Sequence, residues 1–138
     1  MTKTGQQVED DIYGMLKNSP IAELINGQIY KDGMRPRDSN LEDAVVKFVT
    51  GLDNQIQTGT VVINIYVPDI DPFDNGVLVR DITRCTEIET TACTWVKSLT
   101  TAVSDYRFSL AQTIYTEKEE AIGQHFVSIR LNFQLLTI

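Results

Sequence analysis

The stretch 127–135 reads VSIRLNFQL, and its apolar and polar residues alternate without interruption. Successive side chains of a β-strand point to opposite faces of a sheet, so this period of two predicts a strand with one buried face. The residues predicted to be buried are Val127, Ile129, Leu131, Phe133 and Leu135. A strand of this kind indicates a sheet that packs a single apolar face against the rest of the domain.

Other segments predict the remaining strands of this sheet. Residues 28–31, 43–50 and 60–68 are rich in Val, Ile, Phe and Tyr and are bounded by turn-forming residues. Residues 54–59 are polar and are predicted to be a flexible connection, and residues 105–138 are predicted to form two strands around a charged turn. Short connections favour antiparallel pairs, so we expect a mostly antiparallel sheet of about four to five strands.

Three segments have the pattern of helices. Residues 5–18 are amphipathic and follow a capping-box pair, Thr4 and Gln7, and a short helix is predicted to begin at Pro20. Residues 80–102 form the longest predicted helix, with an apolar stripe. This stripe contains Cys85, Ile88, Ala92, Trp95, Val96, Leu99 and Val103. The predicted fold is therefore α+β, a single domain over residues 1–138 with its sheet packed by one long helix and an N-terminal helix pair.

The composition limits the classes of partner. The 138 residues include 12 Lys and Arg but 19 Asp and Glu, which gives a formal charge of −7. This balance opposes general nucleic-acid binding, which needs clustered cations against phosphates. We expect no signal peptide, because the first residues lack an apolar segment, and no membrane span. Cys85 and Cys93 would lie about 12 Å apart along a helix, too far for a disulfide, which fits a reducing cytoplasm.

An acidic loop follows the strand at 60–68. Asp69, Asp71 and Asp74 lie among Pro and Gly residues, but the spacing departs from a calcium-binding loop at its fifth, sixth and twelfth positions. We therefore predict no metal site here. Two interpretations stay open, a solvated turn and a protein-contact loop in which Ile70 and Phe73 are apolar anchors.

No residue pattern indicates an enzyme. His125 is the only histidine, and it has the phase of the buried side of the strand that follows it, so a structural role is expected. No nucleophile motif, zinc-type cysteine cluster or glycine-rich phosphate loop accompanies it. The sequence predicts no catalytic residue and no cofactor.

One cluster of positive charge, in KDGMRPRDSN (residues 31–40), contains Lys31, Arg35 and Arg37. It can be a solvated loop, or it can meet the acidic loop of a neighbouring copy. A head-to-tail ring needs two different patches on each subunit, which these two loops would supply.

Three segments together resemble bacteriophage tail-completion proteins, also called tail terminators or head–tail joining proteins. They are DDIYGMLKNSPIAELINGQIYKDGMRP (10–36), VVINIYVPD (61–69) and HFVSIRLNFQLL (125–136). The resemblance implies a structural virion protein that forms a ring, a hexamer or a dodecamer, at the phage neck or the head-proximal end of the tail. Such a ring ends growth of the tail tube and joins the tail to the head connector, and it carries no catalytic residues.

The resemblance also implies partners and a location. The partners are copies of the chain itself and tail-tube or neck and connector proteins, and the genome passes through without specific binding. The location is the neck or tail of the virion, and the host cytoplasm during assembly. Negative charge on such a wall would repel DNA phosphates. The alternative function is a small bacterial protein-binding adaptor domain of α+β type.

Overall fold

The computed structural model describes residues 2–102 and 104–136, and within them it confirms the predicted α+β class. The helices are α1 (Gly5–Lys17), α2 (Pro20–Leu24) and α3 (Ile82–Thr101), with a single 3-10 turn, η1 (Glu120–Ile122). The strands are β1 (Ile29–Lys31), β2 (Ala44–Leu52), β3 (Ile56–Pro68), β4 (Tyr106–Leu110), β5 (Tyr115–Glu119) and β6 (Gln124–Leu136). Together they form one six-stranded sheet with the order β1-β2-β3-β6-β4, in which β5 also pairs with β6.

The strand β6, which contains the alternating stretch, pairs with three other strands. It pairs antiparallel with β3 along its whole length, from Ile56 opposite Leu136 to Pro68 opposite Gln124. On its other edge it pairs with β4 over residues 131–135 and with β5 over residues 124–128. The sheet therefore has more strands than the four to five predicted, because the segment before β6 is interrupted between β4 and β5 and forms two strands.

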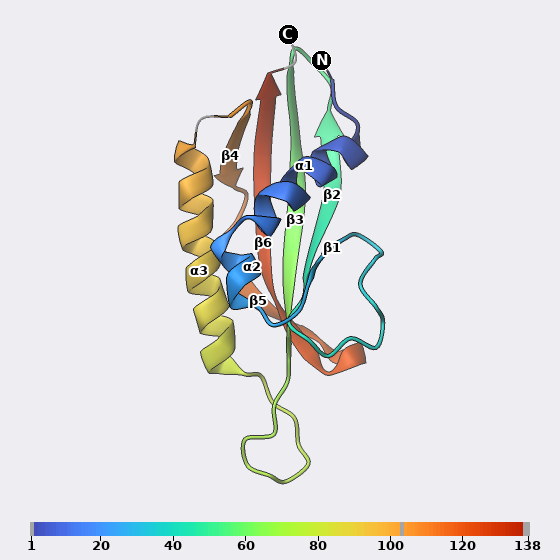
Figure 1. The fold of residues 1–138 in the computed structure, drawn as a ribbon, viewed down its shortest axis with the longest axis vertical. Helices are drawn as coiled ribbons and strands as arrows, with labels where there is room; N and C mark the ends of the chain where they lie inside the picture. Colours follow the sequence, from blue (N-terminus) through green and yellow to red (C-terminus); the bar gives the residue numbers. More distant parts are fainter. Residues whose placement is uncertain (1, 103, 137–138) are drawn as a thin grey trace.

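Two features of the sheet differ from the prediction. The polar segment 54–59 was predicted to be flexible, but β3 begins at Ile56 and pairs with both β2 and β6 there. The buried side chain of Gln57 fixes this end by accepting a hydrogen bond from Lys3 N (3.0 Å) and donating one to Lys3 O (2.8 Å). In addition, β1 pairs with β2 in parallel, because the connection of residues 32–43 loops out beside the sheet and returns the chain to the end where β1 began (Figure 1).

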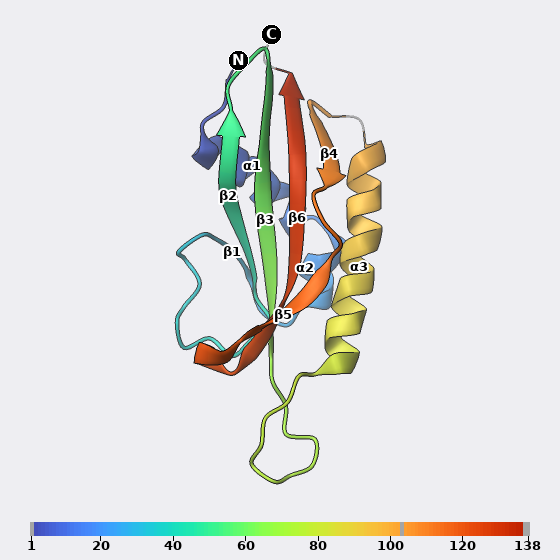
Figure 2. The same cartoon turned by 180° about the vertical axis from the view of Figure 1, so that it is seen from behind.

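All three helices lie against one face of the sheet, and the opposite face carries none (Figures 1 and 2). The capping box at Thr4 and Gln7 is present at the start of α1. In α3 the predicted stripe is buried at Cys85, Ile88, Ala92, Trp95 and Val96, and Leu99 is partly buried. Val103 lies outside the described residues. Cys85 and Cys93 are both free thiols, as expected from their spacing.

The core lies between the helices and the alternating side chains of β3 and β6. Val61, Ile63 and Ile65 are fully buried, as are Ile129 and Leu131 on the neighbouring strand. Each such side chain contributes about 1.5–3 kcal/mol through removal from water, so the two strands supply a large share of the burial that stabilises the fold. Among the described residues, no helix combines the length and the apolar character that crossing a membrane requires.

Candidate functional site

The predicted acidic loop projects from the end of the domain. Residues 69–81, here called the projecting loop, leave the end of β3 and extend away from the sheet before α3 begins (Figure 1). Ile70 and Val79 close its base with two backbone hydrogen bonds of 2.9 and 2.8 Å. The tip beyond this closure makes no packing contact with the core cluster.

The interior of the projecting loop is organised by its own side chains. The carboxylate of Asp71 accepts hydrogen bonds from Asn75 N (3.1 Å) and Gly76 N (2.9 Å), and Asn75 Oδ1 accepts one from Val77 N (3.0 Å). Asp74 and Gly76 have φ values of 52° and 78°, a backbone region that aspartate and glycine tolerate better than most residues. Asp71 is therefore a turn-forming residue, and within the described part of the chain no three His, Cys, Asp or Glu side chains converge on a point.

The projecting loop carries exposed apolar side chains. Phe73 is 75% exposed, and other exposed apolar side chains continue into the start of α3. They are Ile70, Val77, Leu78, Val79 and Ile82. Single exposed apolar residues are common on protein surfaces, but a patch of several is unfavourable in water. Several large apolar side chains on one ordered loop are therefore typical of a protein-contact surface.

An open cleft lies between the projecting loop and the body of the domain. Its apolar lining includes Ile70, Phe73 and Leu78, and its polar lining includes Lys118 and His125. His125 Nδ1 lies 2.7 Å from Asp69 Oδ1, and both side chains are largely buried, so this pair ties the base of the loop to β6.

The Asp69–His125 pair has the geometry of two members of a catalytic triad. No Ser, Thr or Cys side chain in the described residues hydrogen-bonds to His125, so the third member that nucleophilic catalysis uses is not in place. His125 also lies opposite Val67, on the helix-covered side of the sheet, where the sequence pattern predicted it.

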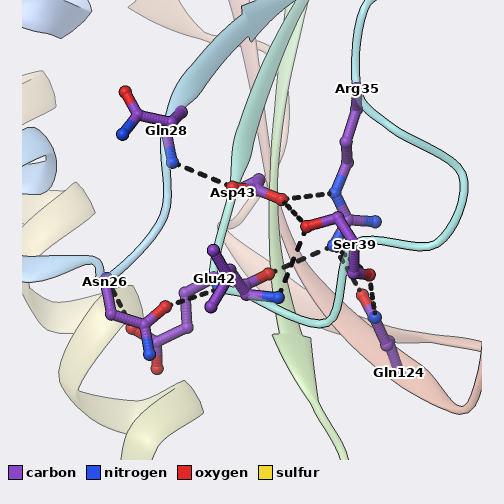
Figure 3. Close-up of polar contacts among 8 residues, drawn as sticks. Asn26, Gln28, Arg35, Ser39, Glu42, Asp43 and Gln124 are labelled. Carbon is purple, nitrogen blue, oxygen red and sulfur yellow. Dashed lines mark hydrogen bonds and ion pairs between the residues drawn. The ribbon is translucent and has the colours of Figure 1, made fainter.

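The predicted basic cluster is divided by the structure. Arg35 turns inward, where its Nε donates to Asp43 Oδ2 (2.9 Å) and its Nη2 donates to Gln124 Oε1 (2.9 Å), as Figure 3 shows. Its guanidinium also lies 4.2 Å from the ring centroid of Tyr66. Lys31 pairs with Asp10 at 2.7 Å, and this pairing raises the pKa of Lys31. Arg37 is exposed and makes no ion pair within the described residues.

Asp43, which the sequence did not single out, is the centre of this network (Figure 3). Its side chain is 1% exposed and accepts hydrogen bonds from Gln28 N (2.8 Å), from Ser39 Oγ (2.5 Å) and from Arg35. Gly27 packs against it so closely that a Cβ atom there would lie 2.1 Å from Asp43 Oδ1. The carboxylate therefore joins the start of β2 to the segment before β1 and to the loop between them.

Glu42 makes a second buried ion pair, with Arg84 of α3. Arg84 Nε and Nη2 donate to the two carboxylate oxygens of Glu42 at 2.6 and 2.7 Å. Hydrogen bonding to Glu42 is the main cause that raises the pKa of Arg84 above its usual value. Glu42 Oε1 also accepts from Asn26 N, and Asn26 Oδ1 accepts from Glu42 N (2.8 Å). Arg84 Nη2 also donates to Leu24 O at the end of α2, so these contacts hold α2 and α3 against the end of the sheet.

Both predicted loops lie at the same end of the sheet, because both are attached to the first residues of β6. Gln124 contacts Arg35, and His125 contacts Asp69. The acidic and basic loops are therefore attached to the same end of the sheet in one copy of the chain, although Gln124 and His125 point to opposite faces of β6.

No protein-family model matches this chain, and no curated protein matches it. The function proposed below therefore depends on the geometry of the projecting loop and on the resemblance described above.

Proposed function

We propose that this chain is a structural protein of a bacteriophage particle that acts by assembling with copies of itself and with tail-tube or neck proteins. The observation that carries this proposal is the projecting loop, in which exposed apolar side chains stand on a backbone that is already ordered. The proposal follows the resemblance to tail-completion proteins, whose role is assembly and not catalysis.

The energetics of the projecting loop favour a contact surface. Burial of one exposed side chain such as Phe73 or Leu78 in a partner would contribute about 1.5–3 kcal/mol. A few anchors of this kind commonly supply most of the affinity of an interface. Because Asp71 and the Ile70–Val79 backbone pair already fix the loop, less conformational entropy is lost on binding than for a disordered segment.

The charge of the chain is compatible with a ring through which DNA passes. A formal charge of −7 disfavours attachment to phosphates, so the genome would not be retained by the wall of the ring. In this proposal the apolar anchors supply adhesion between proteins, and the excess of acids limits adhesion to DNA.

The position of the chain in the particle tests the proposal. A short epitope tag would be fused to the chain in the genome that encodes it, and particles would be imaged after gold labelling. The expected label lies at the junction of capsid and tail. Particles without label at that junction, or particles that form normally when the gene is deleted, would rule the proposal out.

The cleft beside the projecting loop favours a second candidate, a small adaptor that binds one peptide segment of another protein. Its apolar lining and the nearby Lys118 and His125 would suit an anchor residue with a polar neighbour. The two candidates differ in copy number, because an adaptor acts as a monomer in a complex with one partner. Native mass spectrometry of the complex recovered from infected cells separates them.

A further inference from the structure

The face of the sheet that carries no helix has an unusual distribution of charge. Three cations of the chain point to this face, Lys47 from β2, Arg107 from β4 and Arg130 from β6. We call the part of the face around them, with its strands in front of the helices in Figure 2, the helix-free face. In the described residues none of the three cations makes an ion pair.

The register of the strands places these cations in rows that contain no acids. Lys47 and Arg130 lie in one row across the sheet, on either side of Val62, about 10 Å apart at the usual strand spacing. The next outward-facing row contains Thr50, Thr60, Asn132 and Ser109, and the row after it contains Leu52, Thr58, Gln134 and Arg107. No Asp or Glu occurs in these three rows, although acids outnumber cations in the chain as a whole.

The surface of these rows is hollowed. A shallow trough is lined by the short side chains of Thr50, Thr60 and Ser109, with Arg107 at its side. Such a surface offers space, hydroxyl and amide groups and positive charge. A compact segment with negative charge would fit it in both shape and charge.

The projecting loop is a segment of this kind. It contains four aspartates against the single cation Arg80. Asp69 is paired with His125 and Asp81 caps α3, but Asp74 is exposed and makes no side-chain hydrogen bond in the described residues. The Asp71 carboxylate also lies in this loop, where it accepts two backbone hydrogen bonds.

The loop cannot reach the trough of its own chain. It begins after Pro68, and Thr58, which lies opposite Gln134 near Arg107, is ten residues earlier on β3, a separation of about 33 Å along the strand. The loop also points away from the sheet (Figure 1). A contact between these two surfaces therefore has to join different copies, and it would be head-to-tail, the arrangement that closes into rings.

We propose that the projecting loop of one copy docks on the helix-free face of the next copy, where Lys47, Arg107 and Arg130 receive the aspartates of its tip. This inference rests on the proposed function, because it names the two surfaces through which copies join. In this inference the helix-free face takes the place of the predicted basic loop as the partner of the acidic loop, because Arg35 of the basic loop is already paired with Asp43 and Gln124. Duplex DNA could also bind a face with three cations, but the formal charge of −7 on the whole chain opposes DNA binding and favours the acidic loop as the partner.

Carbodiimide cross-linking of the full chain tests the contact directly, because this reagent joins a lysine amine to a carboxylate that touches it. Unlabelled protein would be mixed with ¹⁵N-labelled protein, treated and digested. The expected products are peptides that join Lys47 of one isotope to Asp71 or Asp74 of the other. If no such mixed-isotope peptide forms, the inference is overturned, even when the protein is a monomer by sedimentation.

Charge variants provide the second arm of the test. Reversal of the face in Lys47→Glu/Arg130→Glu should weaken self-association by about tenfold or more, because like charges would then meet. The matched control is Lys97→Glu, which reverses an exposed lysine of α3 that makes no ion pair in the described residues. Equal association of the face variant and the control would contradict the proposal.

Complementation then identifies the two surfaces as partners. The loop variant Asp71→Asn/Asp74→Asn removes charge and keeps residues that suit the turn. A mixture of the face variant with the loop variant retains one intact contact, so the expected product is a one-to-one pair and no larger assembly. If the mixture does not pair, the two surfaces are not partners.

The outcomes separate this inference from the proposed function. Duplex DNA that binds the wild-type chain in fluorescence anisotropy and is released by the face variant would assign the face to nucleic acid and overturn the inference. Gold label at the capsid–tail junction without any Lys47 cross-link would retain the proposed function and reject this contact alone.

Discussion

Removal of the Asp43 carboxylate should be among the most damaging single changes to this chain. In Asp43→Ala, the amide of Gln28 and the hydroxyl of Ser39 each lose an acceptor, at 2.8 and 2.5 Å in the wild type. Arg35 loses its only ion pair in the described residues, and its side chain is 11% exposed. The variant thus leaves a buried charge and a buried amide without the partner that compensated their desolvation.

The expected loss of stability follows from these contacts. Breaking a buried ion pair by removal of one partner costs about 3–5 kcal/mol. Arg35 would still donate to the carbonyl oxygens of Ser39 and Leu41 and to Gln124, which places the expected loss near the lower limit, about 3 kcal/mol. A domain of ordinary stability has only about 5–15 kcal/mol in total, so the change would be easily measured.

Urea unfolding followed by circular dichroism is the assay, with the same slope required for wild type and variant so that the midpoints can be compared. Arg37→Ala is the matched control, because Arg37 is exposed and unpaired within the described residues, and it should change the free energy of unfolding by no more than about 0.5 kcal/mol. A loss below about 1 kcal/mol in Asp43→Ala would show that the network does not hold the fold together.

Three further predictions concern backbone space, thiol chemistry and loop order. Gly27→Ala should destabilise the chain by about 1–3 kcal/mol in urea unfolding, because the added Cβ would overlap Asp43 Oδ1. Gly14→Ala, at an open position of α1, should instead stabilise the chain by about 0.5–1 kcal/mol. Equal effects of the two substitutions would contradict the close packing at Gly27. Near neutral pH, iodoacetamide should modify Cys93 and spare Cys85 in the native protein, because burial raises the pKa of the Cys85 thiol to about 11 and keeps it protonated. Labelling is measured by mass spectrometry, and comparable labelling of the two cysteines would be inconsistent with the burial of Cys85. Asp71→Ala should leave global stability within about 0.5 kcal/mol but increase hydrogen exchange of the amides of residues 75 and 76, and unchanged protection there would mean that the carboxylate does not order the loop.

The fold class followed from local patterns because the strongest patterns belong to the elements that form the core. The alternation from Val127 to Leu135 predicted the central strand, and the stripe around Trp95 predicted the face of α3 that is buried. The polar start of β3 was missed because its pairing with β6 and the anchoring of Gln57 by Lys3 are contacts between distant parts of the chain. Tertiary partners there override a sequence that resembles a loop.

The candidate site was predicted in part. Ile70 and Phe73 were expected to be exposed anchors, and they are exposed on the projecting loop, but Val77, Leu78 and Ile82 were not included. The signal for Val77 and Leu78 was a short apolar run between a Gly-containing turn and the cap of a helix, which resembles a strand in sequence, whereas Ile82 lies after the cap as the first residue of α3. The inward turn of Arg35 could not be predicted, because its acceptors Asp43 and Gln124 are brought to it only by the complete sheet.

The position of β6 in the order of strands has a consequence for synthesis of the chain. It is translated after β3, β4 and β5, yet all three pair with it. Until β6 leaves the ribosome, β3 has β2 on one edge and an open, apolar edge on the other. The sheet is therefore completed in one late step, and we expect the nascent polypeptide to depend on chaperones until that step has occurred.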